Sequence, residues 1–321
     1  MDIEVYSVGE LLVDITILDP GLVREGTHLE IHFGGAPANV AIGVSRLGHK
    51  SGMISCVGND IFGDFLIRTL EENGVDTKFV KRKNARTTLA FVMLYENGER
   101  EFFFYRLPWA NTADSMLEPN DINLDEISKA RVIHFSGFAT SHGQTADTIL
   151  YMIRRLSHAG VTISYDPTFR KDVWITVDKA LEVHSECMKY VNFLSMGIDE
   201  LKGLYGDISP NSLAEKLFNK YPNLETIAIR LGSRGAYVRT RSEEVEVPAF
   251  RITPVDTTGA GDAWTAGFIV YYLLEENGLE RAVKYANAVA AIKCMARGAI
   301  TSLPHRRTVE EFVNKFINDR S

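Results

Sequence analysis

Short apolar runs alternate along most of the chain with stretches whose apolar residues recur at helical spacing. The runs lie at residues 5–9, 51–57, 132–135, 161–165, 191–194 and 226–230. Continuous apolar runs of this length are typical of strands buried on both faces, whereas Val40, Val44 and Leu47 show the spacing of an amphipathic helix. The alternation predicts an α/β fold with a doubly wound, mostly parallel central sheet flanked by helices.

One part of the chain departs from this alternation, because several strand-like segments follow one another without helices between them. These segments are residues 16–33, 78–83, 87–95 and 100–106. Asn97 and Gly98 form a strong hairpin signal between the last two. We therefore expect a single domain over residues 1–321, with a small antiparallel β lid formed by two insertions at about 15–33 and 78–107.

Four consecutive aromatic residues, Phe102, Phe103, Phe104 and Tyr105, place rings on both faces of one lid strand. A small surface sheet ordinarily has one polar face. Two apolar faces imply that one is covered by the main domain or a ligand and the other by a second subunit. We therefore expect a homodimer formed through the lid.

A glycine-rich stretch at residues 254–264 leads directly into a helix. Gly259 and Gly261 lack a Cβ, so the backbone there can turn tightly and bring its N–H groups close to a ligand. The first N–H groups of a helix have no intrahelical acceptor and carry the positive end of its dipole, so this place suits a phosphate. Asp262 would repel such an anion unless it accepts a proton while the amides hold the charge. The alternative is a turn in which Asp262 only caps the helix.

A second glycine-rich helix start follows an earlier strand. Gly34 and Gly35 precede Pro37, a residue suited to a first helical turn. Backbone amides can approach a polar ligand there, and Asn39 offers both a donor and an acceptor. Asp14 lies just beyond the first strand, at the edge where an open parallel sheet places its ligands. The alternatives are a plain strand-to-helix turn and a solvated turn aspartate.

Charged residues also follow two later strands. Asp166 and Arg170 come at the end of the strand at residues 161–165 and project into the same rim. They either pair with each other, or the Arg170 guanidinium clamps a phosphate of the substrates, which its planar fork suits. Asp199 and Glu200 lie in the first turn of a helix, where acidic side chains suit the dipole.

Composition narrows the class of protein further. The formal net charge of −7 argues against a general nucleic-acid surface. The three cysteines are far apart and lack metal-ligand spacing, which favours reduced thiols in a cytoplasmic protein. We recognise no signal peptide, and the longest apolar stretch, residues 263–274, is too short to span a bilayer. We therefore expect a cytoplasmic protein with no nucleic-acid or membrane partner.

The two glycine-rich helix starts carry a family resemblance that covers nearly the whole chain. Residues 34–41, Gly-Gly-Ala-Pro-Ala-Asn-Val-Ala, look like the N-terminal signature of the ribokinase-like (pfkB) carbohydrate kinases. Residues 256–263, Asp-Thr-Thr-Gly-Ala-Gly-Asp-Ala, look like their C-terminal signature. The resemblance implies a phosphotransferase that moves the γ-phosphoryl group of ATP onto a sugar hydroxymethyl, with Mg²⁺ as cofactor and K⁺ in potassium-activated members.

The resemblance also implies roles for single residues. Asp262 matches the catalytic base. The backbone anion hole for the transferring phosphoryl group matches Gly259, Ala260 and Gly261. Contacts to sugar hydroxyls match Asp14, Gly34, Gly35 and Asn39. The nucleotide-side turn and the adenine pocket match Gly232, Gly235 and Asn287, and a monovalent-cation site matches Asp256, Thr258, Gly298 and Ser302.

One departure concerns the family's Asn-x-x-Glu motif, which is linked to Mg²⁺ and phosphate positioning. It aligns with residues 197–200, where Gly197 replaces the asparagine and Glu200 is retained. Glu200 is therefore kept as an indirect metal residue on the nucleotide side.

The acceptor sugar is suggested by two segments. The form of residues 34–39 is similar to fructokinases and to aminoimidazole riboside kinases. Arg106-Leu-Pro, followed by Ala113 and Asp114, is similar to a fructokinase segment, and Arg106 would then reach from the lid into the sugar site. Fructose is the first expectation. The alternatives are 2-keto-3-deoxygluconate kinase, ribokinase and a nucleoside or aminoimidazole riboside kinase.

Two hypotheses of other classes are weaker. A non-catalytic nucleotide- or sugar-binding sensor would be favoured by a substituted Asp262, but the aspartate is intact. A dinucleotide-dependent oxidoreductase is disfavoured because no GxGxxG motif follows the first strand.

Overall fold

The computed structural model describes residues 2–17, 23–94 and 100–318. Its centre is a nine-stranded sheet in the order β13-β12-β11-β10-β9-β8-β1-β4-β5. The strands are β1 (Val5–Val8), β4 (Ser51–Gly58), β5 (Asp76–Lys83), β8 (Val132–Ser136), β9 (Thr162–Asp166), β10 (Phe193–Gly197), β11 (Thr226–Arg230), β12 (Ala236–Thr240) and β13 (Glu244–Val247). Neighbouring strands are parallel except in the pairs β11–β12 and β12–β13, which are antiparallel because β12 runs against the other strands.

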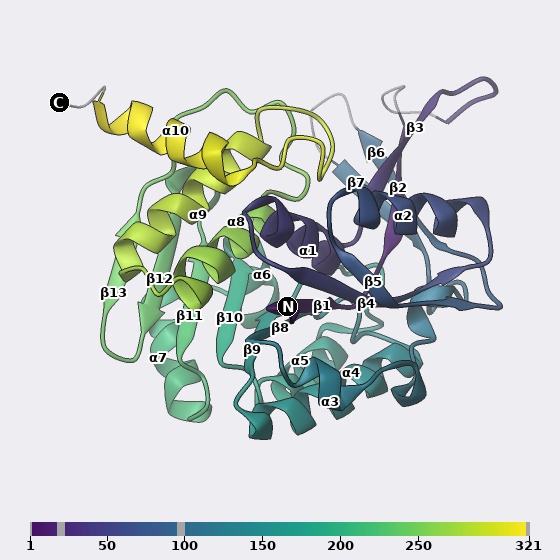
Figure 1. Cartoon of the computed structure of the whole chain (residues 1–321), viewed down its shortest axis with the longest axis horizontal. Helices are drawn as coiled ribbons and strands as arrows, with labels where there is room; N and C mark the ends of the chain where they lie inside the picture. Colours follow the sequence, from purple (N-terminus) through teal and green to yellow (C-terminus); the bar gives the residue numbers. More distant parts are fainter. Residues whose placement is uncertain (1, 18–22, 95–99, 319–321) are drawn as a thin grey trace.

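Helices cover both faces of this sheet (Figure 1). One layer contains α1 (Ala36–Arg46), α2 (Ile61–Glu72), α8 (Ala260–Phe268), α9 (Leu279–Lys293) and α10 (Arg306–Asn318). The other contains α3 (Leu124–Ile127), α4 (Gln144–Leu156), α5 (Val177–Cys187), α6 (Ile198–Tyr205) and α7 (Pro210–Lys220). Each layer buries its own hydrophobic core against the sheet. The predicted doubly wound α/β architecture is confirmed.

Shorter helical segments complete the chain. They are the 3-10 turns η1 (Ala113–Ser115), η2 (Pro119–Asp121), η3 (Ser157–Ala159) and η4 (Gly232–Arg234), and the π-helical segment η5 (Ile269–Leu274). The helix expected from residue 263 onward begins at Ala260 and continues through η5.

A second, four-stranded sheet packs beside the main one in the order β3-β2-β6-β7. Its strands are β2 (Leu12–Ile17), β3 (Leu29–Gly34), β6 (Thr88–Leu94) and β7 (Arg100–Tyr105). β2 and β6 are parallel and the two outer pairs are antiparallel. The hairpin signal at Asn97 and Gly98 lies outside the described residues.

One strand assignment is wrong. Residues 78–83, expected in the small sheet, belong to β5, which pairs in parallel with β4 at the edge of the main sheet. Phe79 and Val80 are buried there, while the neighbouring lysines and Arg82 give β5 the charged character of a protected edge strand. The alternation of residues predicts a strand but does not indicate which of two neighbouring sheets the strand joins.

The small sheet has two different faces, set by the alternation of its strands. Asp14 and its partner His32 lie on the face toward the interior cavity. The opposite face carries Ile31, which is 54% exposed, and Phe103, which is 41% exposed. Phe104 is buried, with its ring centroid 4.9 Å from that of Phe138 in the main domain. The main domain thus covers one aromatic face of β7, as expected, while a second subunit on the other face stays a prediction.

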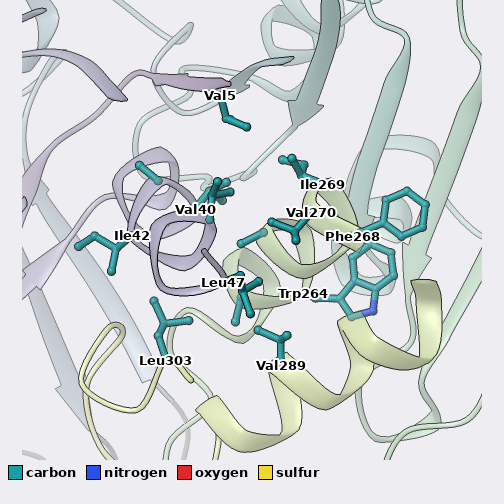
Figure 2. Packing of buried hydrophobic residues seen from close by; sticks show 14 of the residues in the cluster. Val5, Val40, Ile42, Leu47, Trp264, Phe268, Ile269, Val270, Val289 and Leu303 are labelled. Carbon is teal, nitrogen blue, oxygen red and sulfur yellow. The ribbon is translucent and has the colours of Figure 1, made fainter. Parts of the chain in front are cut away.

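Helices α1 and α8 pack closely against each other (Figure 2). Gly43 makes this approach possible, because a Cβ at this position would lie only 2.6 Å from the Cβ of Ala266. Val40 and Val270 belong to the shared core around this contact. The packing brings the N-terminal turns of the two helices together, although they are more than two hundred residues apart in sequence.

Candidate active site

The N-terminal turns of α1 and α8 meet through one hydrogen bond. The Asn39 Nδ2 group donates to Asp262 Oδ2 at 2.7 Å. Asn39 is buried, and its Oδ1 has no hydrogen-bond partner among the described residues. Burial raises the pKa of Asp262 to about 6, although the Asn39 hydrogen bond and the nearby arginine charges oppose this. The pair therefore offers a carboxylate whose pKa lies near neutral pH. It also offers an amide oxygen that can accept a hydrogen bond from a ligand.

The turn before α8 depends on its glycines. Gly259 has a φ of 74°, in the left-handed region, and a Cβ there would lie 3.2 Å from Ala299. A Cβ on Gly261 would lie 3.2 Å from the Arg230 guanidinium carbon. The Ala260 amide donates to the Thr257 carbonyl oxygen at 3.1 Å, which closes the turn. The amides of the first helical turn beyond it have no acceptor within the helix and suit an anion.

Arg230 lies directly beneath this turn and was not recognised from the sequence. Its Nη1 donates to Asp166 Oδ2 at 2.5 Å and to the Ser195 and Thr265 hydroxyl oxygens at 2.6 and 3.0 Å. Its Nη2 donates to Glu200 Oε2 at 3.3 Å. Because the guanidinium lies next to Gly261, it places a fixed positive charge beside the anion-binding turn. Its position at the C-terminal end of buried strand β11 was the signal that could have found it.

Of the two alternatives for Asp166 and Arg170, the one in which they pair with each other is not found in the structure. Asp166 pairs with Arg230, and its Oδ1 accepts from the Thr168 amide at 3.0 Å. The Arg170 side chain is 41% exposed, 3.9 Å from Glu200 Oε1, and lies over the Phe102 ring. Thr168, with a positive φ of 40°, turns the chain between the two residues. Arg170 is thus left available at the rim, where its charge acts on Asp14 and Asp262.

Glu200 organises the backbone around Arg230. Its Oε1 accepts from the Phe169 amide and its Oε2 from the Gly197 amide, both at 2.8 Å. Burial and the Asp166 charge raise the pKa of Glu200. A Cβ at Gly197 would lie 4.0 Å from Arg230 Nη2, so Arg230 takes up space beside the position where the family motif has asparagine.

The acceptor side of the site is built at the start of α1. Gly35, with a φ of 110°, could not carry a Cβ because it would lie 2.4 Å from the Glu10 carbonyl oxygen. A Cβ on Gly34 would lie 2.5 Å from Asp14 Oδ2. Burial, together with the Asp262 charge, raises the pKa of Asp14 to about 7. Asp14 therefore lies against Gly34, and it is close enough to Asp262 for the two carboxylates to interact.

Glu10 supports this helix start from below and was also missed. Its Oε1 accepts from the Ala36 amide at 3.2 Å, and its Oε2 accepts from the Ser136 hydroxyl. Burial raises the pKa of Glu10 to about 7. Glu10 follows β1 and Ser136 ends β8, so this contact lies where the order of the strands reverses, the usual ligand crevice of open α/β sheets.

A cavity of about 340 Å³ lies between the small sheet and the loops before α8 and after α9. Asp14, Thr16 and His32 line it on one side. Asp256, Thr258 and Arg297 line it on the other. Its lining mixes charged and hydroxyl side chains with apolar ones such as Val92 and Val255, and Asp14 is one of the lining residues, so it suits a small hydroxylated ligand.

Arg106 does not reach into this cavity, which corrects the expectation from its motif. The side chain is fully buried, its Nε donates to Asp114 Oδ2 at 2.6 Å, and its Nη1 donates to the Ser141 hydroxyl at 2.8 Å. The guanidinium carbon lies 4.9 Å from the Phe138 ring centroid. A buried charge requires a partner, and Asp114, which belongs to the same motif, supplies it. Arg106 and Asp114 thus form an internal ion pair below the site.

The predicted nucleotide-side residues lie around the turn between β11 and β12. Gly232 and Gly235 have φ values of 63° and 109°, and a Cβ on Gly235 would lie 2.0 Å from the Val247 carbonyl oxygen. Asn287 is buried, and its amide donates to the carbonyl oxygens of Val247 and Pro248 at 3.0 and 3.2 Å. Its Oδ1 accepts from the Trp264 indole at 2.7 Å. Asn287 therefore fixes the wall of this region through its own polar atoms, instead of offering them to a base.

The residues expected at a monovalent-cation site are bound to one another. Asp256 accepts from the Thr258 and Gly298 amides, each at 2.9 Å, through its two carboxylate oxygens. Lys293 Nζ donates to the Asp256 carbonyl oxygen at 2.7 Å. The Ser302 hydroxyl donates to the Lys293 carbonyl oxygen at 2.5 Å. A protein ammonium group thus already lies among the atoms assigned to a cation.

Three further observations concern metal ligands, thiols and membrane-spanning helices. Within the described residues, no cluster of three or more His, Cys, Asp or Glu side chains is arranged to hold a metal ion. The three cysteines are buried and free. None of the helices in the described part of the chain combines the length and the apolar character needed to cross a membrane.

Two glycine-dependent helix starts thus converge on one carboxylate at the carboxyl edge of a doubly wound sheet, and the fold is that of the ribokinase-like kinases. The chain belongs to the pfkB family of carbohydrate kinases, whose family model matches residues 2–306.

Individual relatives agree with this family assignment. The chain is 34% identical to probable fructokinase-5 of Arabidopsis thaliana over 309 residues, which cover 94% of both chains. A structure of fructokinase with bound ATP from Xylella fastidiosa is 25% identical, with a TM-score of 0.86 and coverage of 98% of this chain and 99% of that one. A fructokinase double mutant from Vibrio cholerae O395, in fructose, ADP and potassium ion bound form, is 28% identical, with a TM-score of 0.86 and coverage of 97% and 98%.

Proposed function

We propose that this protein is an ATP-dependent sugar kinase that transfers the γ-phosphoryl group to a hydroxymethyl of fructose. The observation that carries the proposal is the contact between Asn39 and Asp262, which unites the acceptor side and the anion-binding turn in one site. Relatives named as fructokinases favour fructose as the acceptor. The cavity next to Asp14, whose lining includes carboxylate and hydroxyl groups, is large enough for a monosaccharide.

In this mechanism Asp262 accepts the proton of the attacking hydroxyl. The hydroxyl oxygen forms its bond to the γ-phosphorus while the bond from that phosphorus to the bridging oxygen of ADP breaks. The first-turn amides of α8 stabilise the charge on the transferring group, and Arg230 beneath Gly261 adds positive potential. Asn39 orients Asp262 and leaves its own Oδ1 to accept from the sugar. The glycine-dependent turn fits a nucleotide phosphate because side chains are excluded from it.

A magnesium ion fits this site only as a companion of the nucleotide. Mg²⁺ is usually held by one or two carboxylates, by substrate phosphates and by water. Because both oxygens of Glu200 accept from backbone amides, we propose that Glu200 contacts the ion through water. When bound, the ion neutralises phosphate charge.

The proposal is tested by a coupled ADP-release assay with ATP and a panel of fructose, ribose, 2-keto-3-deoxygluconate and nucleosides. We expect the highest kcat/KM with fructose. A higher value for another sugar would keep the kinase class and replace the acceptor, while ADP release with none of them would overturn the proposal.

The pKa of Asp262 predicts the acid limb of the pH profile. The base works only when deprotonated, so kcat/KM should rise with pH through about 6 and level off above it. Below that pKa the value should fall about tenfold per pH unit. A profile that stays flat between pH ~5 and ~7 would contradict Asp262 as the base.

We propose that the small sheet acts as a lid over the sugar and that its outer face pairs with a second copy. Leu29, Ile31, Phe103 and Tyr105 supply exposed apolar surface there. Analytical ultracentrifugation at micromolar concentration should then give a dimer. Replacing Ile31 and Phe103 with lysine should give a monomer, whereas a monomeric wild-type protein would refute this pairing.

A further inference from the structure

Lys293 is the last residue of α9, and its side chain is completely buried. A buried ammonium is costly unless charged or polar groups surround it. Here the Nζ group donates to the Asp256 carbonyl oxygen at 2.7 Å, and its charge also acts on the Asp256 carboxylate. The C-terminal end of a helix favours a cation as well. The structure therefore holds one fixed positive charge in the interior next to the turn before α8.

The surroundings of this charge connect it to the anion-binding turn. Burial alone would raise the pKa of Asp256, but the Thr258 and Gly298 amides and the Lys293 charge hold it well below its usual range. Asp256 is therefore a permanent anion that ties the chain before Gly259 to the loop after α9. The carbonyl oxygen of the next residue, Thr257, accepts a hydrogen bond from the Ala260 amide. The order of this loop thus determines where the first-turn amides of α8 point.

A potassium ion does not fit well among these groups. The Asp256 carbonyl oxygen already accepts from an ammonium, both carboxylate oxygens accept from amides, and the Ser302 hydroxyl is directed to the Lys293 carbonyl oxygen. K⁺ needs oxygen atoms that are free to turn toward it, and a second positive charge near Lys293 would be repelled.

We propose that the Lys293 ammonium takes the place of a monovalent cation beside the Asp256–Thr258 turn, so that this kinase orders its anion-binding turn without K⁺. The inference rests on the proposed kinase function for its activity readout. Lys293 is a positioning residue, because it acts on the phosphoryl site through the loop and touches no substrate.

The first test uses the wild-type protein in potassium chloride and in choline chloride of equal ionic strength. We expect the same kcat and the same Tm in both salts. A wild-type kcat that requires K⁺, or a Tm that rises specifically with K⁺, would overturn the proposal. Absence of sugar phosphorylation in both salts would count against the proposed function instead, and the Tm comparison would still decide the cation question.

The second test removes the ammonium in Lys293→Ala, with Lys293→Met as the variant that retains most of the packing volume. In choline chloride we expect kcat to fall by up to roughly 100-fold, the cost of misplacing groups at the reacting centre by about 1 Å. K⁺ should restore much of this loss in Lys293→Ala and raise its Tm, since an ion that binds the native state stabilises it. Lys284→Ala, on the same helix but partly exposed, should respond to neither salt. A loss that K⁺ does not repair in either variant would assign Lys293 a structural role only.

Discussion

Replacing Asp262 with asparagine is expected to lower kcat by at least ~100-fold, the low end for a positioned proton acceptor. The substitution keeps the size of the side chain and its ability to hydrogen-bond Asn39, but an amide cannot take the hydroxyl proton. ATP affinity should change little, because the first-turn amides and Arg230 remain. Steady-state kinetics with fructose and calorimetric titration with ATP measure the two effects separately.

The matched control is Asp199→Asn, which removes an exposed acidic residue from the first turn of α6. It should leave both kcat and ATP affinity unchanged. Near-normal turnover in Asp262→Asn would remove Asp262 from the role of base and would restore the interpretation of this residue as a simple helix cap.

Replacing Arg106 with methionine is expected to lower the free energy of unfolding by about 3–5 kcal/mol, because it leaves the Asp114 charge buried without its partner. Both side chains of this ion pair are 0% exposed. The Thr88 and Thr112 hydroxyls also donate to Asp114 and would remain, so the carboxylate would keep only neutral partners. Chemical denaturation followed by circular dichroism measures the change.

Two further variants sharpen this test. Asp114→Asn in the Arg106→Met background should recover part of the lost stability, since the unpaired charge is then removed. Arg307→Met breaks an exposed ion pair with Glu311 and should cost less than about 1 kcal/mol. Normal stability of Arg106→Met together with a raised KM for the sugar would instead place Arg106 in the sugar site.

The glycine-dependent helix starts were predictable because their chemistry is local. Gly34, Gly35, Gly259 and Gly261 each lie in a short stretch where turn, helix start and polar neighbour follow one another in sequence. The structure adds what each glycine avoids, such as the Arg230 guanidinium below Gly261. The meeting of α1 and α8 could be inferred only from the family resemblance, because it depends on the close packing of Gly43 against Ala266.

Long-range charge pairing was not predictable. Arg230 finds its partners on β9, β10, α6 and α8, and no spacing in the sequence connects these elements. The spacing of Asp166 and Arg170 left open whether they pair with each other, because the turn at Thr168 that separates them has no signal in the sequence. Arg106 has the right motif, yet its burial becomes visible only once Phe138 and Ser141 are placed around it. Lys293 directly follows an apolar run at residues 288–292, and this local pattern is consistent with its burial.

The most direct test of the central claim is ³¹P NMR of the protein mixed with ATP, Mg²⁺ and fructose. We expect that a sugar-phosphate signal appears in equal amount to ADP, that no inorganic phosphate accumulates, and that Asp262→Asn abolishes this conversion on the same timescale. Formation of inorganic phosphate in place of a sugar phosphate, or an unchanged ATP spectrum with the wild-type protein, would contradict it.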